Sequence, residues 1–304
     1  MTRRPRLAIT LGDPRGIGPE ITTAVLATGI DAEITVIGAR EQIGPLAGVR
    51  QIATGSWRPT DGVARNTAIE AGLIAGRAVE QAARLALAGD VDAIVTAPVE
   101  KHALHLAGFP FPGHTEWLAH LAGGCDVAMM LASDRLRVVL VTTHVALRDV
   151  PLLLTTDRIV RIGMVTRNAL RDWFGIAEPR LAICALNPHA GEQGLFGDEE
   201  QRILKPAAER LGASGPLPAD TVFVRAMHGE FDAVLAPYHD VGMTAIKVAS
   251  FGHGVNVTLG LPFVRTSPDH GTAIDIAGTG RADSGSMHAA VQLALDLATR
   301  SRPA

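Results

Sequence analysis

The stretch Asp-Ala-Val-Leu-Ala-Pro-Tyr-His-Asp, residues 232–240, joins an apolar run to a polar turn. Residues 232–236 form a short run that contains Val and Leu and is mostly apolar on both faces. Such a run predicts a strand in a sheet covered by helices. The Tyr238-His239-Asp240 that follows carries side chains that can bind a metal or move a proton. The segment therefore predicts a buried strand that ends in a functional loop.

The same pattern recurs along the chain. Short runs rich in Val and Ile alternate with longer helical patterns, and this alternation predicts an α/β fold with a largely parallel sheet. Residues 40–63 bear Gly and Pro and have no clear period, so we expect irregular structure there. The expected strands are residues 7–11, 33–38, 92–96, 137–143, 180–186, 232–236 and 254–259, and the expected helices are residues 17–26, 67–88, 155–174, 198–211 and 286–300.

Length and composition bound the class of protein. A chain of 304 residues can bury a large core and favours two lobes, which we expect to be discontinuous, about residues 1–105 with 250–304, and about 106–249. A formal charge of −3 argues against a nucleic-acid binder, which would show a basic excess. Cys125 and Cys184 form no zinc motif or disulfide framework, so a reduced, cytoplasmic setting is expected. No run is long enough to span a membrane, and no signal peptide is evident.

Three histidines stand in polar company just after predicted strands: His144, His189 and His239. Ligands gather at the carboxyl ends of strands in open α/β sheets. Neutral imidazoles bind zinc and other divalent ions, and three protein ligands with an open position are typical of a catalytic metal. The histidines lie far apart in sequence, so three unrelated loop histidines remain an alternative.

A second group of residues suits an anion. Lys247, Asn256 and Arg265 recur nine residues apart near three β-like segments, and Lys and Arg together match phosphate or carboxylate. Ordinary surface charge is the alternative, but apolar flanks predict that Lys247 and Arg265 are not fully exposed. His114 and Thr115 precede an apolar helical pattern, where they could hold an anion at the helix start or act as a plain cap.

Two further features leave their roles open. Residues 12–20 form a tight turn after the first strand, but they lack the full GxGxxG, so a standard Rossmann dinucleotide site is not supported. The acids Asp220 and Asp240 could transfer a proton or support a bound group, and each could also be a cap or loop acid.

A series of motifs follows in a fixed order along the chain: GDPRGIGPE at 12–20, VTAPVEK at 95–101, PGHTE at 112–116, TTH at 142–144, NPHAGE at 187–192, GPLPADT at 215–221, YHD at 238–240, GVNVTLGLP at 254–262 and RTSPDHGT at 265–272. In these motifs the chain resembles the 4-hydroxythreonine-4-phosphate dehydrogenase (PdxA) family of vitamin B6 synthesis. That family belongs to the isocitrate/isopropylmalate dehydrogenase-like group, which GIGPE at 16–20 and HGTAIDIAG at 270–278 also echo. The expected fold is therefore a two-lobed α/β/α arrangement that differs from a standard Rossmann fold.

The resemblance implies a role for each motif residue. His144, His189 and His239 match ligands of one divalent ion (zinc, cobalt or magnesium), in a site shared across a homodimer interface. The substrate-binding positions are His114, Thr115, Lys247, Asn256 and Arg265, and Asp220 and Asp240 lie close to the site. His270, Gly271, Ala273 and Asp275 fall in the segment that meets the adenine side of NAD or NADP.

The resemblance also implies a reaction. The expected activity is NAD-dependent, metal-assisted oxidation and decarboxylation of 4-phosphohydroxy-L-threonine to 3-amino-2-oxopropyl phosphate. Val241 stands where the biosynthetic enzymes usually carry Gln, and residues 40–63 are short and diverged. The same chemistry on D-threonate or D-erythronate 4-phosphate, or on a cyclic dihydrodiol carboxylate, is therefore the alternative. From other classes, a metal-dependent hydrolase and a non-catalytic binding protein are the remaining hypotheses.

Overall fold

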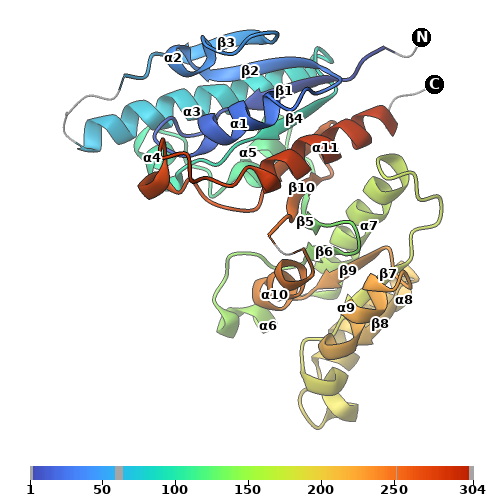
Figure 1. Cartoon of the computed structure of the whole chain (residues 1–304). Helices are drawn as coiled ribbons and strands as arrows, with labels where there is room; N and C mark the ends of the chain where they lie inside the picture. The colour runs from blue at the N-terminus through green and yellow to red at the C-terminus, as the bar shows by residue number, and fades with distance from the viewer. Residues whose placement is uncertain (1–2, 59–63, 251, 301–304) are drawn as a thin grey trace. The chain divides into compact units, whose positions relative to one another are not determined.

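The chain divides into two units, one formed by Met1–Cys125 with Leu261–Ala304 and the other by Asp126–Gly260. The computed structural model describes residues 3–58, 64–250 and 252–300 (Figure 1). Both units combine strands with helices, which confirms the α/β class predicted from the sequence. None of the helices in the described ranges has the length and apolar character that a membrane crossing would need.

The first unit holds a parallel sheet in the order β3-β2-β1-β4-β11. Its inner strands are built from residues with almost no exposed surface, such as Leu7, Ile9, Ile94 and Val95, as the two-sided apolar pattern predicts. The strands are β1 (Arg6–Thr10), β2 (Glu33–Ala39), β3 (Arg50–Gly55), β4 (Ala93–Thr96) and β11 (Val264–Pro268).

Small residues let the helices of this unit pack closely. A side chain at Gly72 would place its Cβ 2.1 Å from the Ala103 carbonyl oxygen, and one at Gly76 would meet the Phe109 ring. The long helix α3 therefore needs glycine where it meets the α4 region. The helices are α1 (Gly18–Leu26), α2 (Arg40–Ile43), α3 (Ala64–Leu87), α4 (Lys101–Leu106), α5 (His114–Leu121), η4 (Ile274–Ile276) and α11 (Gly285–Arg300).

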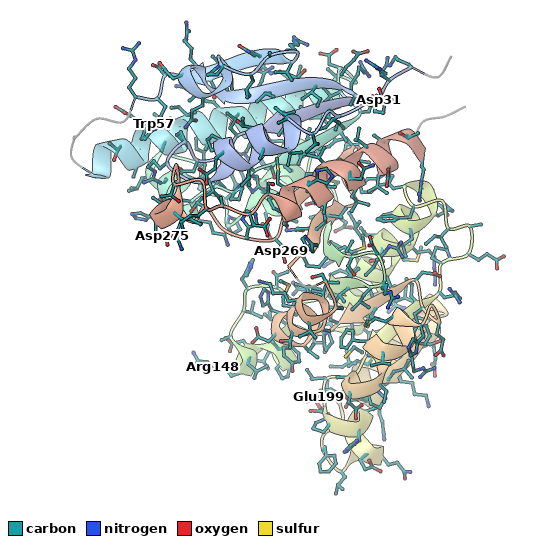
Figure 2. The ribbon with its side chains drawn as sticks, in the orientation of Figure 1. Asp31, Trp57, Arg148, Glu199, Asp269 and Asp275 are labelled. Carbon is teal, nitrogen blue, oxygen red and sulfur yellow. The ribbon has the colours of Figure 1, made fainter. Side chains whose placement is uncertain are left out.

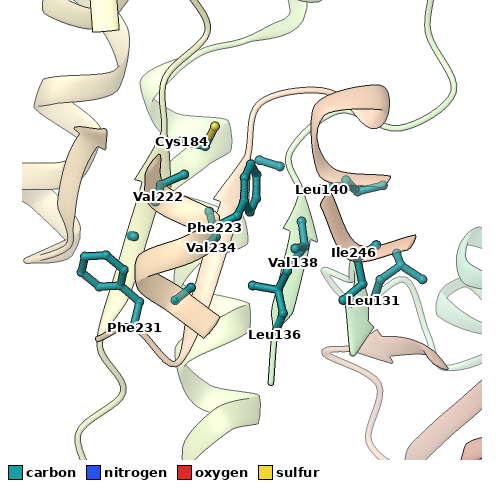
Figure 3. Packing of buried hydrophobic residues seen from close by; sticks show 13 residues of the cluster. Leu131, Leu136, Val138, Leu140, Cys184, Val222, Phe223, Phe231, Val234 and Ile246 are labelled. Carbon is teal, nitrogen blue, oxygen red and sulfur yellow. The ribbon is translucent and has the colours of Figure 1, made fainter. Parts of the chain in front are cut away.

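The second unit holds strands in the order β10-β5-β6-β9-β7-β8. The pairs β10–β5 and β5–β6 are antiparallel, whereas β6, β9, β7 and β8 run parallel. Figure 3 shows the core that forms between these strands and the helices α9 and α10, with Val138, Val234, Phe223 and Ile246 among its buried residues. The strands are β5 (Ala128–Ala132), β6 (Arg137–Leu140), β7 (Leu181–Cys184), β8 (Ser214–Leu217), β9 (Ala233–Ala236) and β10 (Val255–Leu259).

Helix α10 corrects one expectation. The residues before β10 fold as a helix from His239 to Ser250, so Lys247 lies on a helix and not near a β-like segment. Its neighbour Ile246 is buried, but the next position of a helix turns about 100° away, and Lys247 is exposed. Lys247 is therefore among the exposed residues in spite of its apolar flanks. The remaining helices are η1 (Leu147–Asp149), α6 (Val150–Leu153), α7 (Thr156–Asp172), η2 (Pro188–Gly194), η3 (Glu200–Leu204), α8 (Lys205–Leu211) and α9 (Ala219–Met227).

Candidate functional site

The three histidines of the proposed metal site follow three neighbouring parallel strands. His144 comes after β6, His239 after β9 and His189 after β7, and these strands stand side by side in the order β6-β9-β7. The first two loops are tied together, because Thr142 Oγ1 donates a hydrogen bond to the Pro237 carbonyl at 2.7 Å. The sheet thus brings all three loops to one edge, where open α/β sheets bind ligands.

Two of the imidazoles face each other. The ring centroids of His144 and His239 are 5.4 Å apart with a 43° angle between the planes. The buried Nδ1 of His239 has no hydrogen-bond partner among the described residues, and His144 is exposed. Because a zinc–nitrogen bond is about 2.0–2.1 Å long, rings at this separation can share one ion. The pair fits a divalent metal.

His189 lies on a separate segment of the same unit. Figure 1 shows this yellow segment between β7 and α8 extending away from the strands. The backbone is left-handed from His189 to Gln193, with φ of +50° at His189, and the exposed imidazole lies 6.4 Å from the Phe196 ring, centroid to centroid. Within the described residues, no three His, Cys, Asp or Glu side chains form one metal cluster. A single chain therefore brings His144 and His239 together without His189.

Arg265 supplies a buried positive charge in the first unit. Only 2% of it is exposed, and its Nη2 donates a hydrogen bond to Thr96 Oγ1 at 2.6 Å. Burial lowers the pKa of Arg265 to about 9, because a cation is less stable away from water, and the Glu116 carboxylate partly offsets this. The burial predicted from the sequence is confirmed, and such a buried cation is suited to an anionic ligand.

His114 and Thr115 open helix α5 near this charge. Gly113 occupies the N-cap position and has no side chain to cap the helix. The buried His114 Nε2 has no hydrogen-bond partner in the described part of the chain, although the residue as a whole is half-buried. Burial lowers the pKa of His114 to about 3, and the charges of Arg265 and Lys101 lower it further. His114 is therefore neutral at pH 7, and the positive charge of Arg265 favours this neutral form.

The remaining predicted substrate residues and acids lie in the second unit. Asn256 is part of β10, and its buried Oδ1 finds no hydrogen-bond partner in the ranges that the structure describes. Asp240 and Asp220 lie in the first turns of α10 and α9. Both acids are exposed, as is Lys247. An acid in a first helical turn suits the helix dipole, so both positions are compatible with a capping role.

The glycine turn at residues 12–20 is hydrogen-bonded to residues 270–278, the segment expected to bind the adenine side of NAD or NADP. Ile17 N–H donates to the Thr272 carbonyl at 2.9 Å, and Gly278 N–H donates to Glu20 Oε2 at 2.9 Å. A Cβ on Gly16 would lie 2.7 Å from the Thr272 oxygen, so the close approach requires glycine.

The braced segment itself presents polar groups. Ala273 is left-handed with φ of +41°, and the buried His270 Nε2 has no partner among the described residues. Gly271 and Asp275 are exposed, and Asp275 is labelled in Figure 2. An unpartnered ring nitrogen and exposed backbone in a fixed loop fit a nucleotide, whose sugar and base offer hydrogen-bonding groups.

Sequence reasoning missed several residues of these sites. Thr96 holds Arg265, and Lys101 acts on His114, yet both stood in a quoted motif without an assigned role. Arg15 bonds both the buried Asp13 and Glu100, which ties the glycine turn to the loop after β4. Their positions at the carboxyl ends of β1 and β4 were the available signal.

Comparisons with known proteins agree with this geometry. Residues 27–294 match the family model of "Pyridoxal phosphate biosynthetic protein PdxA". The chain is 45% identical to a 4-hydroxythreonine-4-phosphate dehydrogenase of Geobacter metallireducens, over 97% of this chain and 96% of that protein. It is also 45% identical to a D-threonate 4-phosphate dehydrogenase of Salmonella typhimurium, over 96% and 98%. The crystal structure of a 4-hydroxythreonine-4-phosphate dehydrogenase from Klebsiella pneumoniae covers 97% of this chain and 99% of its own, with 41% identity and a TM-score of 0.84. The chain belongs to the PdxA family.

Proposed function

We propose that this member of the PdxA family is an NAD-dependent dehydrogenase that oxidises and decarboxylates 4-phosphohydroxy-L-threonine to 3-amino-2-oxopropyl phosphate, a step in pyridoxal phosphate synthesis. Family membership along nearly the whole chain makes it an oxidoreductase. The observation that carries the proposal is the His144–His239 pair, whose rings lie 5.4 Å apart, centroid to centroid, after the ends of adjacent parallel strands. The name of the Geobacter relative supplies the substrate class.

The anionic ends of the substrate are held by the buried cation and its neighbours. Arg265 offers a planar fork for a phosphate or carboxylate. Because Arg265 is buried, its attraction to a bound anion is stronger than it would be in water. His114 is neutral and supplies a hydrogen bond, and the open start of α5 at Thr115 supplies backbone N–H groups. Lys247 and Asn256 are proposed as further substrate contacts on the basis of their motif positions.

The proposed metal and cofactor divide the redox chemistry. When bound, a divalent ion polarises the substrate hydroxyl and NAD or NADP accepts the hydride. His144 and His239 would hold the ion, and imidazole ligands favour zinc or cobalt over magnesium. His270, Gly271, Ala273 and Asp275 would bind the adenine side of the nucleotide, on the loop that Ile17 and Glu20 brace.

Asp240 is our preferred proton acceptor. The secondary alcohol loses its hydroxyl proton and a hydride from carbon, and the β-keto acid that forms then loses CO₂. The enolate that remains takes up a proton at carbon to give the aminoketone phosphate. The hydroxyl proton must reach a base near the metal ligands. Asp240 adjoins His239 in the chain, whereas Asp220 lies on α9, and it is assigned a supporting role.

A homodimer would complete the metal site. His189 does not join the other two imidazoles within one chain, so we propose that each site takes His189 from a second copy of the chain. Large apolar side chains are exposed in the segments that follow His189 and His144, where Leu195 is 72% exposed and Leu152 is 80% exposed. Such side chains in either segment suit burial between subunits.

The second candidate is the same reaction on D-threonate 4-phosphate, D-erythronate 4-phosphate or a cyclic dihydrodiol carboxylate. Two observations favour it. Val241 stands directly after the Tyr238-His239-Asp240 motif in place of Gln, and the identity to the Salmonella relative equals that to the Geobacter relative. The substrate of the first candidate carries an amine on the carbon next to the carboxylate, where threonate and erythronate 4-phosphate carry a hydroxyl.

A substrate panel tests both. Purified protein is mixed with NAD, a divalent ion and each phosphorylated acid in turn, and NADH absorbance is followed, with His144→Ala as the inactive control. Turnover of the amino acid substrate supports the first candidate, and turnover of only the threonate or erythronate phosphate supports the second. No reduction of NAD or NADP with any substrate, in a protein that remains folded, would reject both.

A further inference from the structure

A buried carboxylate with no role in the proposed chemistry lies beneath the His189 segment. Only 3% of Glu200 is exposed, and its Oε1 accepts backbone N–H bonds from Leu186 at 2.9 Å and Asn187 at 2.7 Å. Its Oε2 accepts a bond from Asn187 Nδ2 at 2.9 Å. Both oxygens of this acid are therefore used to hold the two residues that lead into Pro188 and His189.

The carboxylate also meets the turn that follows His189. A Cβ on Gly191 would come within 2.8 Å of Glu200 Oε2, so the turn folds directly over the acid. Gly191 is buried, although Glu192 and Gln193 beside it are exposed, and Phe196 N–H donates to the Gly191 carbonyl. Glu200 thus contacts the segment on both sides of His189.

We propose that Glu200 is a positioning residue that fixes the direction of His189 toward the metal, an inference that rests on the proposed function. The backbone from His189 to Gln193 is left-handed, which is costly for residues other than glycine and persists only when its surroundings fix it. A buried carboxylate that accepts several N–H bonds provides such a restraint, because moving the segment would leave the charge without partners.

The second acid of this helix start has a smaller part. Glu199, labelled in Figure 2, also accepts a bond from Asn187 Nδ2 through its Oε2, at 2.7 Å, but it is less buried than Glu200. Asp198, one residue earlier, pairs with Arg202 on the surface and has a side chain that is 70% exposed. Asp198 therefore offers a matched control, an exposed acid of the same charge two residues before Glu200.

Cobalt binding tests the assignment with a readout other than activity. Glu200→Gln places an amide where two backbone N–H groups and Asn187 require acceptors. We expect the full-length protein with this change to bind Co²⁺ about 10- to 100-fold more weakly, as is typical when support of a metal ligand is lost. The visible absorption band of bound Co²⁺ should also shift, whereas Asp198→Asn should bind as the parent does. Asn187→Ala removes only the side-chain donor to Glu200 and should also weaken Co²⁺ binding. This variant tests the proposal if Glu200→Gln does not fold.

The outcomes separate this inference from the proposed function. If the parent protein shows no cobalt band, or if His189→Ala leaves Co²⁺ binding unchanged, the metal site itself is wrong. If His189→Ala abolishes tight binding but the folded Glu200→Gln and Asn187→Ala proteins keep the parent affinity and spectrum, Glu200 does not position His189. A lower melting temperature with an unchanged Co²⁺ affinity would likewise limit Glu200 to a structural role and overturn the proposal.

Discussion

Arg265 shows how the surroundings of a single residue indicate its use. A guanidinium that is 2% exposed is costly to bury, and the chain retains it at a position where strand β11 lies beside β4. Thr96 Oγ1, on β4, accepts one of its hydrogen bonds. Sequence patterns predicted that Arg265 would be covered, because Pro262-Phe263-Val264 precede it. They could not identify Thr96, since the contact joins residues that are 169 positions apart.

His114 should make the stability of the ligand-free protein depend on pH. Its pKa falls to about 3 in the folded chain, against about 6.5 when unfolded, so the unfolded state binds one more proton between these values. The free energy of unfolding therefore rises with pH through this window. The contribution linked to neutral His114 is lost as the pH falls from about 6.5 toward 3. Replacing His114 by Asn should flatten this dependence by at most about 1.4 kcal/mol per pH unit.

Urea unfolding of parent and His114→Asn proteins at pH 7.5, 6.5, 5.5 and 4.5, without ligand, measures the effect. The difference between their unfolding free energies should be constant above pH 7 and should change steadily below about 6.5. His120→Asn, an exposed histidine on the same helix, serves as the control. Parallel curves for the parent and His114→Asn across the whole range would contradict the assigned environment of His114.

At the scale of elements, the expected strands are mostly apolar runs, and the strands that were not expected are mostly polar, Gly- or Pro-bearing or partly exposed, although the apolar strand β5 was also missed. Residues 93–96 and 233–236 are apolar throughout apart from Thr96 and fold as expected. Strand β11 is buried along its whole length but reads Val-Arg-Thr-Ser-Pro, and β8 contains Gly215-Pro216. Strand β3 has no buried residue. Polar, Gly- or Pro-bearing strands carry little periodic signal, because tertiary neighbours and not local pattern decide their state.

Helix α10 was missed for a different reason, and that reason predicts a mutant phenotype. Gly242 weakens the helical pattern in the sequence, because glycine is a poor helix former. A Cβ at position 242 would lie 2.6 Å from Leu140 Cδ2 and 2.9 Å from Val138 Cγ1. Glycine lets α10, and with it His239, lie close to β6. Gly242→Ala should overpack this contact and lower the free energy of unfolding by about 1–3 kcal/mol, even though Ala is the better helix former.

Thr244→Ala is the matched control, because Thr244 is exposed on the same helix. It should change the unfolding free energy by less than about 0.5 kcal/mol. Chemical denaturation of the two variants and the parent gives the comparison. A Gly242→Ala protein as stable as the parent would show that the α10–β6 contact has room for a methyl group.

At the scale of the whole molecule, much of the site was predictable as a set of loops but not as a set of contacts. The order β6-β9-β7 places the three histidine loops side by side, as the strand-end argument for His144, His189 and His239 requires. That argument could not tell which rings meet, because ring distances depend on turn geometry such as the left-handed run after His189. Nothing in a single sequence states which contacts form between two copies of a chain.

Mixing two inactive variants tests whether His189 acts in the site of its own chain or in that of a partner. His144→Ala and His189→Ala proteins should each be inactive. If each site combines His144 and His239 of one subunit with His189 from the other, a mixed dimer contains one site that carries both substitutions and one intact site. Random reassortment of equal amounts would then restore about a quarter of the parent activity, by the two-fold symmetry of the dimer.

The control is a mixture of His144→Ala with His239→Ala, since these two residues face each other within one chain. In that mixed dimer each site carries one substitution, so reassortment should restore no activity. Activity and bound Co²⁺ are measured before and after the subunits are denatured together and refolded. If the His144→Ala and His189→Ala mixture also stays inactive while mixed dimers are shown to form, all three histidines belong to one chain. The distance between His189 and the other two rings would then have to close by movement of the segment after β7 and not by assembly.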